Sequence, residues 1–123
     1  MELTINEMLA QAIIAHNDGK LEEAEHLYQK ILETEPNHLD ANNNLANIFQ
    51  HKGKIEQAET LYQKILEIQP LHPDANHNLG VLKVLLNKLD DALPFFKIGL
   101  EGNSNVEQYW ISYIYALVKD NKL

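Results

Sequence analysis

The chain contains no cysteine and no arginine among its 123 residues. Without cysteine it can form neither a disulfide framework nor a thiolate metal site, and nothing indicates an oxidising compartment. All ten basic residues are scattered lysines, and 18 acidic residues give a formal net charge of −8. Nucleic acids are bound through clustered lysine and arginine, so we expect no nucleic acid partner.

Long apolar runs are also missing. The first residues, Met1–Thr4, lack the basic and apolar regions of a signal peptide. The longest nearly apolar stretch, 79–86, is interrupted by Lys83 and is far too short to span a bilayer. We therefore expect a soluble, cytoplasmic protein that has no membrane partner.

The sequence carries no recognisable catalytic or metal-binding motif. None of its six histidines forms a pair at i, i+4 spacing, and neither a glycine-rich phosphate loop nor a nucleophile motif occurs. The acidic pairs Glu22-Glu23 and Asp90-Asp91 begin predicted helices, where they favour the helix dipole. We expect no metal, no cofactor and no enzymatic activity in these residues.

What the chain does contain is an internal repeat with a period of 34 residues. Lys54–Pro70 is identical to Lys20–Pro36 at 12 of 17 positions, and Asp40-Ala41-Asn42 recurs as Asp74-Ala75-Asn76. A fixed period of this length is typical of stacked repeats, in which each unit buries its apolar face against its neighbours.

Each repeat contains two amphipathic helices. Ala24, Leu27, Tyr28 and Ile31 follow the i, i+3, i+4, i+7 spacing of one helix face, and the same stripe recurs 34 residues later. The pattern predicts an all-α fold, an α-solenoid of antiparallel helix pairs. Seven helices are expected, near residues 4–17, 21–35, 39–52, 55–69, 73–86, 89–101 and 105–119.

Turn and cap residues separate these helices. Gly19, Gly53 and Asn87 stand where a left-handed backbone conformation would end a helix. Capping boxes are predicted at Thr4-x-x-Glu7 and at Ser104-x-x-Glu107.

The repeat resembles the tetratricopeptide repeat, a helix–turn–helix of 34 residues with the pattern W-x₂-L-G-x₂-Y, then A-x₃-F, then P. In the second unit the pattern falls on Leu45-Ala46, Phe49, Ala58, Tyr62 and Pro70. Trp110 stands at the tryptophan position of a fourth unit, and Asn42 takes that position in the second. The resemblance divides the chain, as one domain, into repeats 5–38, 39–72 and 73–106 and a partial fourth repeat or capping helix, 107–123.

This resemblance implies a right-handed superhelix whose concave groove binds an extended peptide segment of a partner protein. It also suggests the N-terminal scaffold of a larger protein. The groove positions of the family fall on Asn43, Asn44, Asn47, His51, Asp74, His77, Asn78 and Val81.

Asn44-Leu45-Ala46 and Asn78-Leu79-Gly80 are similar to the steps of the O-linked N-acetylglucosamine transferases, in which an asparagine ladder holds the peptide backbone. A carboxamide offers both a donor and an acceptor, so it can pair with one peptide unit without reading side chains. The resemblance therefore implies a broad specificity.

Some tetratricopeptide co-chaperones instead clamp an acidic C-terminus with lysine and arginine. Here the corresponding positions lack cations in either register, so we reject that ligand. The positions are Leu9, Asp74 and Asn78, or Asn43, Gln108 and Ser112.

The last predicted helix is apolar nearly all round. One face must cover the third repeat, and the opposite face would remain exposed, which is typical of an interaction site. We expect self-association, most simply as a homodimer, through Trp110, Ile111, Ile114 and Tyr115. A self-assembling structural scaffold with no peptide ligand is therefore the alternative function.

Overall fold

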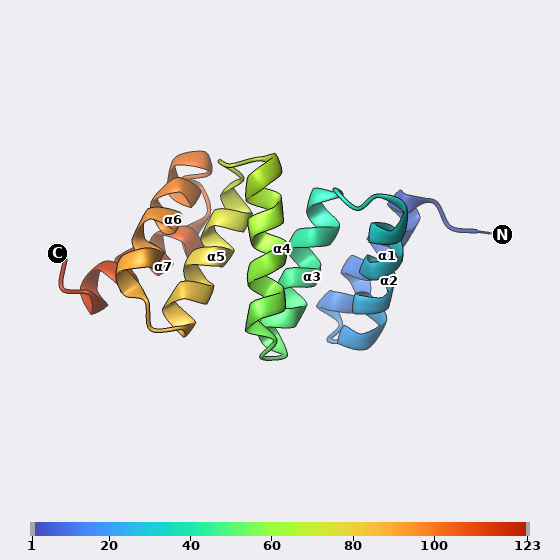
Figure 1. The fold of residues 1–123 in the computed structure, drawn as a ribbon, viewed down its shortest axis with the longest axis horizontal. Coiled ribbons are helices and arrows are strands. Elements are labelled where there is room, and N and C mark those ends of the chain that lie inside the picture. The colour runs from blue at the N-terminus through green and yellow to red at the C-terminus, as the bar shows by residue number, and fades with distance from the viewer. Residues whose placement is uncertain (1, 123) are drawn as a thin grey trace. The chain divides into compact units, whose positions relative to one another are not determined.

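A computed structural model describes residues 2–122 of the chain, and in this range it contains seven α-helices and no strand (Figure 1). The helices are α1 (Ile5–Asn17), α2 (Leu21–Thr34), α3 (Leu39–His51), α4 (Ile55–Ile68), α5 (Pro73–Leu85), α6 (Leu89–Gly102) and α7 (Glu107–Lys119). The predicted all-α class and all seven helices are confirmed. The largest error is at the start of α7, which was expected two residues earlier.

The helix boundaries follow the 34-residue period of the sequence. Helices α1, α3, α5 and α7 begin at residues 5, 39, 73 and 107, and α2, α4 and α6 begin at 21, 55 and 89. The N-caps of the odd-numbered helices that follow the same period are Thr4, His38, His72 and Val106. Each repeat therefore folds as the same local unit.

The odd-numbered helices end in one kind of turn. The turn residue has a positive φ in every case: 77° at Gly19, 78° at Gly53, 59° at Asn87 and 60° at Asn121. The next N–H donates to the carbonyl five residues earlier, as Lys20 N does to Ala15 O at 2.8 Å. This is the Schellman pattern, and it requires the left-handed conformation that glycine and asparagine tolerate. The predicted helix-ending roles of Gly19, Gly53 and Asn87 are confirmed.

One of the two predicted capping boxes is wrong. The first is present: Glu7 N donates to Thr4 Oγ1 at 3.1 Å and Thr4 N donates to Glu7 Oε1 at 3.0 Å. The second, Ser104-x-x-Glu107, does not form, because α7 starts at Glu107 with Val106 as an N-cap that lacks a side-chain hydrogen bond. The carbonyl of Ser104 is instead an acceptor for the Trp110 indole N–H.

The described structure divides into two compact units, Met1–Leu61 and Tyr62–Leu123, called here the first and second unit. The division falls inside α4. In the first unit α1 packs on α2 and α2 on α3. The core of the first unit is a cluster of buried side chains: Ala12, Ala15, Ala24, Tyr28, Ile31, Ala41, Leu45 and Ile48.

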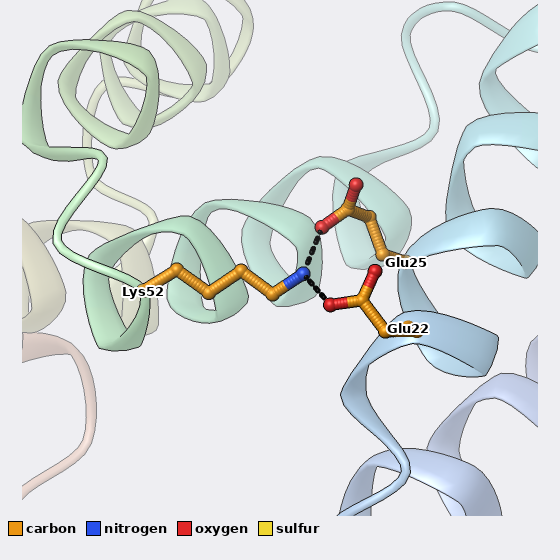
Figure 2. A network of polar contacts seen from close by, with 3 residues as sticks. All are labelled: Glu22, Glu25 and Lys52. Atoms are coloured by element: carbon orange, nitrogen blue, oxygen red, sulfur yellow. Dashed lines mark hydrogen bonds and ion pairs between the residues drawn. The ribbon is translucent and has the colours of Figure 1, made fainter.

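An ion-pair network joins α2 to the end of α3 in the first unit (Figure 2). Lys52 Nζ lies 2.5 Å from Glu22 Oε1 and 2.8 Å from Glu25 Oε1. The hydrogen bond from Lys52 lowers the pKa of Glu22, and the bond to Glu22 contributes most to the raised pKa of Lys52. These side chains lie at the surface, where ion pairs add little stability, so the network chiefly positions the end of α3.

In the second unit α5 packs on α6, α6 packs on α7, and α5 also contacts α7. Gly80 allows the close approach of α5 to α6, since a Cβ at this position would meet two Phe96 ring carbons at 2.6 Å. Phe96 clusters with Ala92 and Ala116. Helix α7 therefore covers the third repeat, as predicted, and Phe96 and Leu100 are only 1% and 6% exposed.

Small residues occupy one buried position of the second helix in each repeat. Ala24, Ala58 and Ala92 are all fully buried, as their 34-residue spacing predicts. None of the helices in residues 2–122 combines the length and the apolarity needed to cross a membrane.

Candidate functional site

Two buried asparagines fix the entry of the chain into α3 and α5. Asn42 Nδ2 donates to the carbonyls of Pro36, at 3.0 Å, and His38, at 2.8 Å. Asn76 makes the same pair of bonds one period later, at 3.1 and 2.8 Å. Buried polar groups are stable only when hydrogen-bonded, so these bonds hold the connector in place and determine which face α3 and α5 present.

Trp110 performs the same task at the start of α7. Its indole Nε1 donates at 2.8 Å to Ser104 O, six residues earlier, just as Asn42 donates to Pro36 O. Both side chains provide an N–H donor at this distance from the helix start. The prediction that Asn42 takes the place of Trp110 is confirmed.

Histidines cap the same two helices. His38 Nδ1 accepts from Ala41 N at 3.1 Å, and His72 Nδ1 accepts from Ala75 N at 3.0 Å. An accepting Nδ1 places the ring proton on Nε2. These residues serve structure, in agreement with the predicted turn or capping role.

The predicted groove residues of α3 lie at or near the surface of the first unit. Asn43, Asn44 and Asn47 are half-buried, and His51 is exposed. His51 Nδ1 lies 2.8 Å from Asn47 O, one turn earlier in the helix.

Asn44 also influences the core of the first unit. Tyr28 of α2 is fully buried, and burial raises the pKa of its phenol, while the nearby Asn44 carboxamide lowers it. Asn44 therefore connects the surface of α3 to the interior of this unit.

The predicted groove residues of α5 divide into accessible and buried ones. Asp74 is exposed, Asn78 and Val81 are half-buried, and His77 is only 7% exposed. The imidazole of His77 stacks on Tyr109, with ring centroids 4.4 Å apart and planes at 19°. Its Nε2 lies 2.8 Å from Ser112 Oγ.

Polar contacts between α5 and α7 surround this histidine. The Tyr109 hydroxyl donates to Asp74 Oδ1, and the His77 Nδ1 atom faces Asn78 Oδ1 at 3.4 Å. Burial lowers the pKa of His77, and the Asn78 contact and the charge of Asp74 oppose this effect. His77 and Asp74 thus hold α7 against α5, whereas a direct ligand contact of either residue stays a prediction.

A cavity of about 300 Å³ opens in the second unit. Its walls come from α5, α6 and α7, and its lining residues are Val81, Val84, Phe96, Gln108, Ile111, Ser112 and Tyr115. It brings the predicted groove residue Val81 together with Ile111 and Tyr115, which the sequence predicted for self-association.

Helix α7 presents three faces. At about 100° per residue, Tyr109 and Ala116 share the buried face, and Ile111 and Tyr115 share the cavity face. Trp110, Ile114 and Val118 form a third face, called here the outer strip, and are 46%, 49% and 56% exposed. The four residues predicted for self-association therefore belong to two different surfaces.

Charge is distributed unevenly between the two units. The first unit has four lysines and eleven acidic residues, whereas the second has six lysines and seven acidic residues. Among the described residues there is no cluster of three or more histidine, aspartate or glutamate side chains that could hold a metal ion.

Two sequence profiles of the tetratricopeptide repeat match the chain, at residues 15–73 and 61–93. Together they span more than half of its length. The chain belongs to the tetratricopeptide repeat family. A search of curated proteins found no match.

Solved structures with the same fold are similar to this tetratricopeptide repeat protein along nearly its full length. The first repeat domain of Spaghetti (RPAP3), bound to the HSP90 peptide SRMEEVD, has a TM-score of 0.84 at 19% identity, with 91% of each chain covered. The Sgt2 domain of Aspergillus fumigatus has a TM-score of 0.86 at 18% identity, covering 96% of this chain and 80% of that one.

A mutant of the O-GlcNAc transferase of Thermobaculum terrenum has a TM-score of 0.87 at 20% identity. The alignment covers 95% of this chain but 23% of the transferase, so the likeness concerns one part of that protein. At these identities the comparisons show the α-solenoid fold of the repeats.

Sequence reasoning missed two residues of the α5–α7 contact, Tyr109 and Gln108. The signal was available, because Asp74–Tyr109 and His77–Ser112 are both separated by 35 residues, one more than the repeat period. In a stacked repeat, such a separation joins equivalent helices of neighbouring units.

Proposed function

We propose that this protein binds an extended segment of a partner protein and that Asn44 and Asn78 pair with its backbone. Membership of the family supports the general role. The half-burial of both asparagines supports the finer one, because a half-buried carboxamide is accessible and yet held in position. The two residues occupy the same position in successive repeats, so each would hold one peptide unit.

The partner segment is neutral or basic. The Spaghetti domain is described with a peptide ending in Glu-Glu-Val-Asp, but the positions that would clamp such an end carry no cation here. The first unit, with eleven acidic residues against four lysines, would repel an acidic segment.

The proposal is tested with a library of extended neutral and basic decapeptides, screened by fluorescence anisotropy. For the tightest peptide, Asn44→Ala with Asn78→Ala should weaken binding about tenfold or somewhat more, since each hydrogen bond contributes about 0.5–1.5 kcal/mol. Asn6→Ala, an exposed asparagine of α1, is the matched control and should leave affinity unchanged.

Because Asn44 lies close to Tyr28, urea denaturation of the same variants shows whether the fold is intact. Equal affinity of the wild type and a folded double variant would refute the asparagine ladder.

Self-assembly is the second candidate function, and the outer strip of α7 supports it. Three large apolar side chains about half exposed on one helix face are a feature of interaction surfaces. In this proposal a second copy covers Trp110, Ile114 and Val118, most simply across a two-fold axis.

A further inference from the structure

The cavity of the second unit has chemically uniform walls. Five of its seven lining residues are apolar, and the other two, Gln108 and Ser112, are uncharged. The second unit contains 13 charged side chains, yet none of them lines the cavity. A site without charged groups disfavours a charged occupant, because burying an unpaired charge is costly.

The size of the cavity limits what can enter it. About 300 Å³ is the volume of roughly ten waters in the liquid, at about 30 Å³ each. An α-helix is about 10–12 Å across with its side chains, so no helix of a second copy would fit. One large side chain would.

The walls are held in place before any ligand binds. Ser112 is bonded to the buried His77, and Phe96, which forms part of the lining, is 1% exposed and clustered with Ala92 and Ala116. A preformed site loses little conformational entropy on binding, which favours affinity.

We propose that this cavity accepts one large uncharged side chain, that of leucine, methionine or phenylalanine, from the bound partner segment. The inference rests on the proposed peptide-binding function and adds side-chain selection to a backbone contact that is itself unselective. Gln108 lies at the mouth of the cavity, where its carboxamide can bond the main chain of the residue whose side chain enters.

The probes for this site are blocked amino acids, because each presents one side chain and no extended backbone. N-acetyl-leucinamide is titrated into protein labelled at its valine, leucine and isoleucine methyl groups and followed by NMR. We expect shifts of the Val81, Val84 and Ile111 methyl signals with a millimolar dissociation constant. N-acetyl-lysinamide and N-acetyl-glutamic acid amide should bind at least tenfold more weakly.

A matched pair of variants locates the binding. Ile111→Asp adds a charge to the cavity wall, and Ile114→Asp adds one to the outer strip at nearly the same exposure, 50% against 49%. The first should weaken leucinamide binding at least tenfold, and the second should change it by less than twofold. Equal effects of the two variants, or equal binding of the three amides, would overturn the proposal.

Failure of this inference can be told apart from failure of the proposed function. The Asn44→Ala, Asn78→Ala variant should bind leucinamide as the wild type does, whatever its peptide affinity. Normal peptide binding by that variant would sink the ladder and leave the cavity standing. Leucinamide shifts confined to the outer strip would instead refute the cavity.

Discussion

His77 is one of three polar side chains that are buried among the described residues, with Asn42 and Asn76. The two asparagines satisfy connector carbonyls, and their hydrogen bonds do not depend on ionisation. His77 differs because it can gain a proton. Its neutral ring is enclosed by Tyr109 and Ser112, with Asp74 and Asn78 as the other polar neighbours.

The lowered pKa of His77 predicts a loss of stability in weak acid. The unfolded chain takes up a proton on this residue near its ordinary value of about 6.5, whereas the folded protein takes it up only at lower pH. The contribution of the neutral ring is therefore complete above about pH 6.5 and declines as pH falls toward the folded pKa. Urea denaturation between pH 7 and 5 measures it.

His77→Gln is the comparison, because glutamine keeps a polar side chain without a titrating proton. The free energy of unfolding of the wild type should fall more steeply over this range than that of the variant. His16, whose pKa is lowered by burial and by His51, contributes to both proteins equally and cancels in the difference. Identical slopes for the two proteins would contradict the structural role given to His77.

At the scale of the helix, α7 shows how one element can serve three surfaces. Its buried face covers α6, its cavity face completes a wall with α5, and its outer strip has no protein covering it among the described residues. A helix of this kind reads as apolar nearly all round in the sequence. Periodicity predicted that the helix would be exposed, but only the packing of α5 and α6 determines which exposed residues belong together.

The outer strip predicts concentration-dependent association. In light scattering at high micromolar concentration, the wild type should have a mass above that of one chain. Ile114→Glu with Val118→Glu should shift the population toward the monomer, because charges on the strip oppose its burial. Gln57→Glu with Gln63→Glu, two exposed glutamines of α4, is a control of equal charge. A monomeric wild type would remove self-assembly from consideration.

For the whole molecule, the 34-residue period was the most reliable guide in the sequence. It predicted the helices to within two residues, because each repeat forms the same turns and caps. The wrong prediction, the capping box at Ser104, came from a local motif taken without the period. The N-caps at residues 4, 38 and 72 place the next one at residue 106, where the structure has it.

The candidate site was less predictable than the fold. The positions of Asn44, Asn78 and Val81 at the surface follow from family spacing, but the burial of His77 does not. It depends on Tyr109 stacking against its ring, and Tyr109 looked like any other apolar residue of the last helix. The cavity has the same origin, since it needs side chains of three helices to be placed together.

The central claim is that carboxamides of this protein hold the backbone of an extended partner. The most direct measurement uses the tightest peptide of the library, resynthesised with each backbone N–H methylated in turn and the side chains unchanged. We predict that methylation at two or more positions weakens binding about tenfold in the wild type and has little effect in the Asn44→Ala, Asn78→Ala variant. Methylation tolerated at every position, or equally harmful in both proteins, would contradict the claim.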